Sequence, residues 1–170
     1  MKKIILLFSV FVLPLMISGQ VAKYKAVFTT NFIRYIGWPE AARQGDFVIG
    51  VIRDKEMVDY FKGLSNGKKF GFQDIVVKEF KSPDEVTYCQ VLFIPETINL
   101  SKNASKIIDK LGGKNSLIIT EKENATKHGS MINFVIRDNK LKFEISKENA
   151  SKFGLQVSSK LMTMKSAISL

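Results

Sequence analysis

Cysteine, histidine and tryptophan each occur once among the 170 residues. The single cysteine, Cys89, has no partner for an intramolecular disulfide. It lies in residues 88–94, a run typical of a strand, and we expect it to be a small buried side chain. The single histidine, His128, lies in a polar loop of Lys, Asn and Gly. One histidine and one cysteine do not make a zinc site of the usual kind, so we expect no metal.

The motifs of the common catalytic sites are missing as well. A Ser-His-Asp triad would have to use His128, but no Gly-x-Ser-x-Gly elbow precedes a helix. Residues 50–54, at the end of the first strand-like run, lack the glycines of a phosphate-binding loop or dinucleotide fingerprint. The acidic pairs at residues 84–85 and 121–123 lie in loops or caps, with nothing to isolate one in an apolar pocket. We therefore expect no enzyme and no cofactor.

Acidic residues are few beside the basic ones. The 26 lysines and arginines against 16 aspartates and glutamates give a net charge of +10. Most of the excess is lysine, scattered along the chain, whereas specific nucleic-acid readers favour arginine and clustered aromatics. This pattern argues against nucleic-acid binding and indicates a solvated surface that favours acidic partners or anionic lipid head groups.

Long apolar runs are limited to residues 4–17, which follow the basic start Met1-Lys2-Lys3. The run is shorter than the roughly 20 residues of a membrane-spanning helix, and Ser18-Gly19 supplies small residues after it. This order is typical of a secretory signal peptide over residues 1–19, with cleavage before Gln20. An uncleaved N-terminal anchor is the alternative. In either case residues 20–170 form one exported domain, which we place in the periplasm without membrane insertion of the mature chain.

Hydrophobic periodicity predicts a first helix over residues 21–36, ended by Gly37-Trp38-Pro39. A buried strand is expected over residues 47–52, followed by a helix that Asp54 caps. Further strands are expected at residues 70–80, 91–94, 116–120, 131–136 and 141–145, the last two joined around Asp138-Asn139. A very short helix capped by Ser82, with Glu85 reaching back, is expected before the strand at 91–94, and Ser101 opens another helix after it. The chain ends in a helical stretch from Lys147 to about Ile168, which Ser146 caps and Gly154 divides.

The alternation of strands and helices predicts an α/β fold. We expect a single three-layer α/β/α domain with a mixed, largely parallel sheet that ends in an antiparallel hairpin.

Two groups of residues are candidates for binding. Arg34, Tyr35 and Trp38 follow an amphipathic helix, and arginine and tryptophan are enriched at interface hot spots. The competing interpretation of Trp38 is a core residue that seats the helix on the sheet. Arg53, Asp54 and Glu121 follow predicted strands, where open α/β sheets bind ligands. Their competing roles are a helix cap at Asp54 and simple solvent contact for the other two.

The order of these motifs resembles the YfiR-like family of exported bacterial proteins. The most specific part is residues 24–39, where Lys25-Ala26 open an aromatic-rich helix that ends at Trp38-Pro39. Further matching segments are residues 47–51, 89–94, 129–134, 143–146 and 154–161.

The resemblance implies a compact α/β regulator. The family's namesake is periplasmic and restrains a membrane-bound diguanylate cyclase by binding its periplasmic sensory domain, which lowers cyclic di-GMP signalling. Similar domains are attached to sensor kinases. The namesake's disulfide-supported redox response does not carry over, because Cys89 has no partner.

The first hypothesis is therefore a regulatory protein that binds a membrane-bound signalling protein. The second is a periplasmic small-molecule sensor or carrier that uses Arg53, Asp54 and Glu121. The sequence is also compatible with a homo-oligomer.

Overall fold

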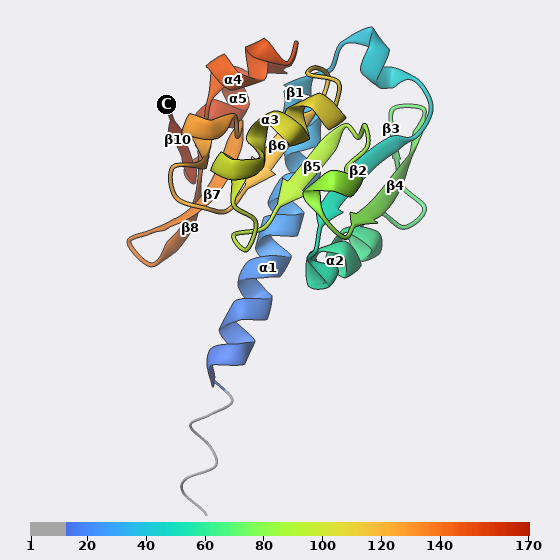
Figure 1. Cartoon of the computed structure of the whole chain (residues 1–170). Helices are drawn as coiled ribbons and strands as arrows, with labels where there is room; N and C mark the ends of the chain where they lie inside the picture. The colour runs from blue at the N-terminus through green and yellow to red at the C-terminus, as the bar shows by residue number, and fades with distance from the viewer. Residues whose placement is uncertain (1–12) are drawn as a thin grey trace, which may run out of the picture.

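The computed structural model describes the backbone of residues 13–170 and the side chains from Gly19 onward. The first twelve residues of the expected signal peptide lie outside the described residues. Its remaining residues begin helix α1, which spans Leu13–Phe32 and continues past the expected cleavage point (Figure 1). Among the residues described, no helix is both long enough and apolar enough to cross a membrane.

The main sheet has eight strands in the order β10-β8-β7-β6-β5-β2-β4-β3. Every neighbouring pair is parallel except the hairpins β7–β8 and β3–β4. The strands span Phe47–Ile52 (β2), Lys69–Phe70 (β3), Gln73–Phe80 (β4), Val91–Ile94 (β5), Leu117–Thr120 (β6), Ile132–Arg137 (β7), Lys140–Ile145 (β8) and Ala167–Ser169 (β10). The expectation of a mixed, largely parallel sheet is confirmed. A second small sheet pairs β1 (Ile36–Gly37) antiparallel with β9 (Gln156–Val157).

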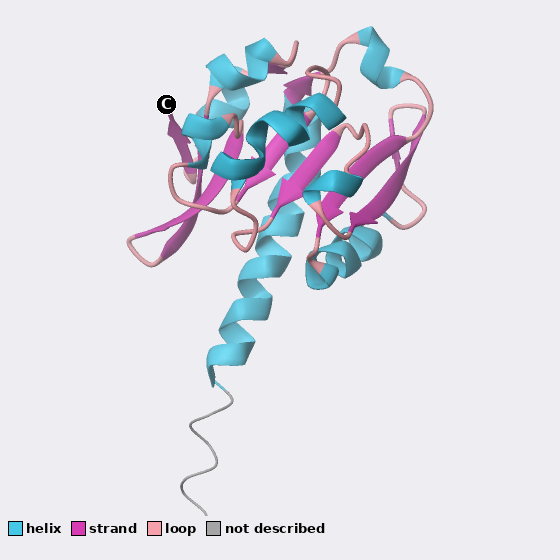
Figure 2. Ribbon diagram, in the orientation of Figure 1, coloured by secondary structure: helices cyan, strands magenta, loops and turns pink. Residues whose placement is uncertain are grey.

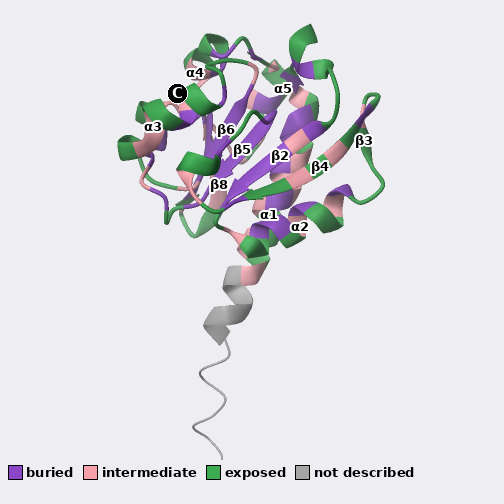
Figure 3. Ribbon diagram, turned by 45° about the vertical axis from the view of Figure 1, so that its right-hand side comes forward, coloured by how far each residue is buried: buried purple, intermediate pink, exposed green. Residues whose placement is uncertain are grey.

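Helices cover both faces of the main sheet, which makes three layers (Figures 1 and 2). Helix α1 packs along α2 (Lys55–Ser65) on one face, and α3 (Leu100–Lys110) lies on the other (Figure 3). Phe61 of α2 meets Phe93 of β5, and Phe32 of α1 meets Phe143 of β8. The shorter helices are η2 (Ile33–Tyr35), η3 (Glu40–Arg43), η4 (Pro83–Glu85), η5 (Ala125–His128), α4 (Lys147–Lys152) and α5 (Ser159–Met162).

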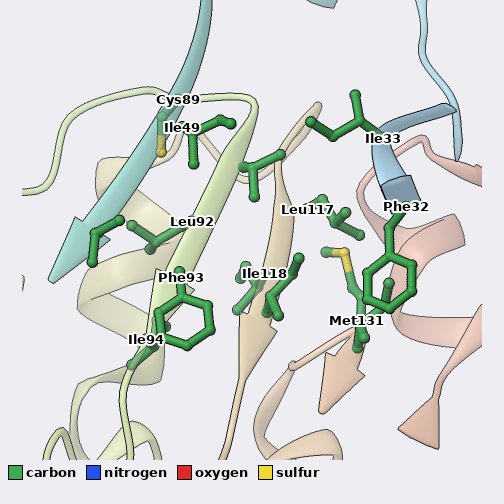
Figure 4. Packing of buried hydrophobic residues seen from close by; sticks show 14 of the residues in the cluster. Phe32, Ile33, Ile49, Cys89, Leu92, Phe93, Ile94, Leu117, Ile118 and Met131 are labelled. Atoms are coloured by element: carbon green, nitrogen blue, oxygen red, sulfur yellow. The ribbon is translucent and has the colours of Figure 1, made fainter. Parts of the chain in front are cut away.

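The centre of the sheet is buried on both faces, as expected for strands between two helical layers (Figures 3 and 4). Gly50 of β2 is a packing requirement, since a Cβ there would lie 2.6 Å from the Phe80 ring and 2.9 Å from Cys89 Sγ. Cys89 is fully buried, which confirms the sequence interpretation. Burial raises the pKa of its thiol to about 12, so the thiol is neutral at physiological pH.

Several local expectations are confirmed by their hydrogen bonds. The Met57 N–H donates to Asp54 Oδ1 over 2.9 Å, so Asp54 caps α2. The β7–β8 hairpin turns at Asp138 and Asn139, whose φ values of 52° and 56° suit a type I′ turn. Ser146 caps α4 by accepting from the Asn149 N–H.

The expected helical stretch from Lys147 to about Ile168 is confirmed only in part, because Ser146 caps it and Gly154 divides it into two helices, but both helices are short. Helix α4 ends at Lys152, and Gly154 follows in the left-handed region with φ 72°. Ser158 then starts α5 as a cap, while flanking residues form β9 and β10. Pairing with β1 and β8 therefore outweighs the helical periodicity of this segment.

Four smaller expectations also change. The strand region 70–80 is a hairpin, because Gly71 takes a positive φ of 60° between β3 and β4. Asn99, two residues before Ser101, caps α3. Ser82 makes no cap bond, and Glu85 accepts from the Lys81 N–H instead. The first helix ends at Phe32 and continues as η2 through Tyr35.

Candidate functional site

Three hollows that share lining residues lie along the β3–β4 end of the sheet, and we call them together the edge groove. The first, of about 380 Å³, is lined by Trp38, Arg43 and Phe70, among others. The second, of about 110 Å³, shares Phe70 with the first and includes Arg34. The third, of about 540 Å³, shares Ser65 and Ile75 with the second. The groove therefore connects the end of α1, the end of α2 and strands β3 and β4.

Trp38 forms a wall of this groove from within the core. Its side chain is only 5% exposed, and its Nε1 donates to the Ile33 carbonyl oxygen over 2.9 Å. The indole meets the Phe47 ring edge to face with centroids 5.1 Å apart. Arg43 Nε donates to the Trp38 carbonyl oxygen, so the loop after Trp38 is fixed to it. Trp38 thus shapes the groove while it stabilises the fold.

The other two residues of the candidate partner surface point to different places. Arg34 is exposed on η2 and lines the middle hollow together with Lys68. Tyr35 is half-buried on the β1–β9 side, where Lys160 Nζ lies 5.8 Å from its ring centroid. Its carbonyl oxygen accepts from the Ser158 N–H. The structure therefore brings Arg34 and Trp38 to one groove and leaves Tyr35 beside it.

Phe72 is a feature that sequence reasoning missed. It is fully exposed at the turn of the β3–β4 hairpin, on the lip of the first hollow. Because aromatic side chains are enriched at protein interfaces, this phenylalanine beside an apolar hollow is a candidate contact for a partner. The sequence signal was Gly71 between two phenylalanines, which marks a turn inside an otherwise strand-like run.

Two buried glutamines hold the loop that borders the groove. Gln73 Nε2 lies 3.1 to 3.4 Å from the carbonyl oxygens of Ala42, Gln44 and Gly45. Gln90 Nε2 donates to the carbonyl oxygens of Ala42 and Asp46, and its Oε1 accepts from the Val48 N–H. These amides satisfy loop carbonyl groups that the core would otherwise leave unpaired, so hydrogen bonds hold the loop beside the groove in place.

The candidate ligand residues lie at the carboxyl ends of strands β2 and β6, and two of the three already interact with other parts of the protein. Asp54 caps α2, and Glu121 forms an ion pair with Lys25 of α1 while accepting from the Glu96 N–H. Arg53 is exposed with a positive φ of 47°, and its N–H donates to the Phe80 carbonyl oxygen. Helix α1 therefore places the ammonium group of Lys25 at the carboxyl ends of the strands, where a ligand was expected.

A closed polar network fixes the loop after β6. Thr120 Oγ1 donates to Asn133 Oδ1, and Asn133 Nδ2 donates to Glu144 Oε2. Arg137 then bridges Glu144 and Glu123, which lowers the pKa of Glu123 below its ordinary value. Because each of these side chains has a protein partner, we interpret the network as structural. Among the side chains described, no three His, Cys, Asp or Glu residues gather as a metal site would require.

A three-layer α/β domain with a groove along one sheet edge is the class of protein that this fold and site define. Over residues 22–165 the sequence matches the family described as YfiR/HmsC-like, and the chain belongs to that family. The match confirms the resemblance inferred from the motifs. A search of curated proteins finds no match.

Proposed function

We propose that this protein is an exported regulator that binds the outer-facing domain of a membrane-bound signalling protein, either a diguanylate cyclase or a sensor kinase. The observation that carries the proposal is the family match over nearly the whole expected mature chain. The edge groove supports it, because it combines an exposed aromatic side chain with Arg34 in one surface. The family match and the groove together support a periplasmic protein that acts by binding a partner.

Export requires that residues 1–19 act as a signal peptide. Cleavage before Gln20 would leave the Gln20–Phe32 part of α1, which is the part that carries Lys25 and packs into the core through Phe32. The hydroxyl of Tyr60 donates to the Gly19 carbonyl oxygen, so cleavage would remove this bond and leave the new N-terminus at Gln20 beside α2. N-terminal sequencing of the protein from the periplasm should begin at Gln20.

The regulatory mechanism is thermodynamic linkage. A bound regulator shifts its partner toward the inactive conformation only by the difference in its affinity for the two states. A tenfold preference for the inactive state corresponds to about 1.4 kcal/mol, which is within reach of one or two groove side chains. For a cyclase partner, the consequence is lower cyclic di-GMP.

We place this function ahead of a small-molecule sensor because of the state of the candidate ligand residues. Asp54 and Glu121 already serve as a helix cap and an ion-pair partner. A ligand there would have to replace these interactions. Arg34 and Phe72 are exposed and ready to meet a partner without such a replacement.

The test is a crosslinking pull-down from intact cells with Arg34→Glu. Trp38→Ala is a poor first variant, because Trp38 is a core residue. Arg34→Glu should reduce capture of a membrane signalling protein about tenfold, since a cation at the centre of the groove becomes an anion. Lys140→Glu makes the same charge change at an exposed position on β8, far along the sheet, and should leave capture unchanged. Equal capture by both variants would remove the groove from the proposal.

A further inference from the structure

The outer edge of β4 is only half covered. Strand β3 pairs with Gln73 and Asp74 alone, and the Ile75 N–H donates to the Lys68 carbonyl oxygen as the last bond on that side. Beyond this point, in the part of the chain that the structure describes, no strand pairs with β4 on its outer side. The second half of a long, otherwise regular strand is therefore a free sheet edge.

The direction of the free groups follows from alternation along the strand. The Phe80 carbonyl oxygen accepts from the Arg53 N–H on the β2 side, whereas the Ile75 N–H bonds on the β3 side. Because successive residues alternate, Val77 and Glu79 present their N–H and C=O groups outward. An added strand would find two residues with free backbone groups there.

A hollow lies directly beside these groups. It is the third hollow of the edge groove, between the end of α2 and the side chains of Ile75 and Val77. An extended chain that pairs with the edge would direct alternate side chains into this space. Lys62 borders this hollow and Lys68 the middle one, and neither makes an ion pair among the described residues. These hollows are thus apolar along Ile75 and Val77 and cationic at Lys62 and Lys68, with the exposed carboxylate of Glu79 at the far end of the strand.

We propose that β4 takes up an extended, acid-flanked segment of the partner as an additional strand of the sheet. This rests on the proposed function, and it names the kind of segment that the partner contributes. A second copy of this chain fits poorly. In the antiparallel register that sets Val77 against Glu79, Lys78 would lie opposite Lys78 of the second copy, and like charges directly opposite are unfavourable. An acidic segment meets Lys62 and Lys68 with complementary charge instead.

The first experiment uses the purified mature chain and two synthetic peptides. One has the sequence Asp-Asp-Val-Thr-Val-Asp-Asp, and the control replaces each Asp with Lys. In a nuclear magnetic resonance titration, the acidic peptide should shift the amide signals of Val77 and Glu79 and slow their hydrogen exchange, and the basic peptide should not. No change at these two amides, or an equal change with both peptides, would overturn the proposal.

A matched pair of variants isolates the backbone contribution. Glu79→Pro removes the outward N–H without touching the β2 ladder, and proline is tolerated on an edge strand. Glu79→Ala removes the same carboxylate but keeps the N–H. The acidic peptide should bind Glu79→Pro about tenfold more weakly than Glu79→Ala, the effect of one lost strand hydrogen bond. Equal binding by the two variants would contradict strand addition.

The outcomes separate the two proposals. If Arg34→Glu abolishes capture while the peptides never reach β4, the regulator binds through the groove without an added strand, and this inference fails alone. If the acidic peptide binds β4 but intact cells yield no membrane signalling protein, the proposed function fails instead. If Glu79→Pro converts a dimer to a monomer in sedimentation and no peptide binds, the edge serves a second copy, and the inference is overturned.

Discussion

The two candidate regions of this molecule differ in whether their polar groups are already in use. At the carboxyl edge of the parallel strands, Asp54 caps α2 and Glu121 pairs with Lys25. At the edge groove, Arg34 is exposed and Phe72 projects fully into solvent. Both regions looked plausible from residue types alone.

The difference shows that residue type identifies a candidate, whereas the rest of the fold decides its availability. Open α/β sheets usually bind ligands beyond the carboxyl ends of their parallel strands. Here Lys25 of α1 lies at these strand ends and forms an ion pair with Glu121. At the edge groove, by contrast, Arg34 and Phe72 are exposed, while hydrogen bonds from Gln73 and Gln90 hold the loop beside them.

The largest expected effect concerns the wall of the groove. Trp38→Ala should lower the free energy of unfolding by about 3–5 kcal/mol, because a buried aromatic side chain is lost. Trp38→Phe should cost less, about 1–2 kcal/mol, mainly because the Ile33 carbonyl oxygen loses its donor. Urea denaturation measures both. A loss below 1 kcal/mol for the alanine variant would mean that Trp38 is free to act as a direct contact.

A smaller effect is expected at the carboxyl edge. A double-mutant cycle with Lys25→Ala and Glu121→Gln should give a coupling of about 1 kcal/mol, because both side chains are mostly shielded from solvent. The exposed pair Lys55–Asp59 on α2 is the control and should give about 0.3 kcal/mol. Equal coupling in the two pairs would show that Glu121 is as available as a surface carboxylate, and the contrast between the regions would disappear.

The smallest effect at neutral pH concerns Cys89, whose thiol lies beside Gly50 of β2. Its pKa rises from 9.0 to about 12 in the fold. Between these values the unfolded chain ionises while the folded chain keeps its proton, so stability falls as pH rises from 9 to 12. The slope should be at most about 1.4 kcal/mol per pH unit, and Cys89→Ala should lack this component.

Denaturation of the wild type and Cys89→Ala across this pH range measures the difference. Parallel stability curves would show that the thiol is not shielded. Thiol labelling at pH 8 gives a second readout, and it should proceed only through opening of the β2–β4 region. Labelling as fast as that of the unfolded chain would mean that the groove end of the sheet is not firmly packed.

Much of the fold follows from local patterns in the sequence. Asp54 and Ser146 cap their helices, and Asp138-Asn139 turns its hairpin, because each effect depends on neighbouring residues only. The final segment follows its periodicity only in part, because Gly154 divides it as expected but its two helices are short. Residues 147–168 split into two short helices and two strands, since β1 and β8 supply pairing partners that the local sequence does not reveal.

The site was only partly predictable for the same reason. Arg34 and Trp38 were identified by residue type, and the fold does bring them to one groove. Phe72 and Gln73 were missed, because their role depends on a turn at Gly71 inside a strand-like run. The ion pair of Lys25 with Glu121 joins residues 96 positions apart and has no local signal.

The most direct test of partner binding at the groove is to incorporate a photo-crosslinking amino acid at position 72, on the lip of the groove, in intact cells. If the partner binds at the groove, we expect an adduct with the outer-facing domain of a membrane signalling protein, identified by mass spectrometry. The same probe at position 140 should give no such adduct. An adduct from position 140 alone, or none from position 72 while the protein is folded and exported, would contradict partner binding at the groove.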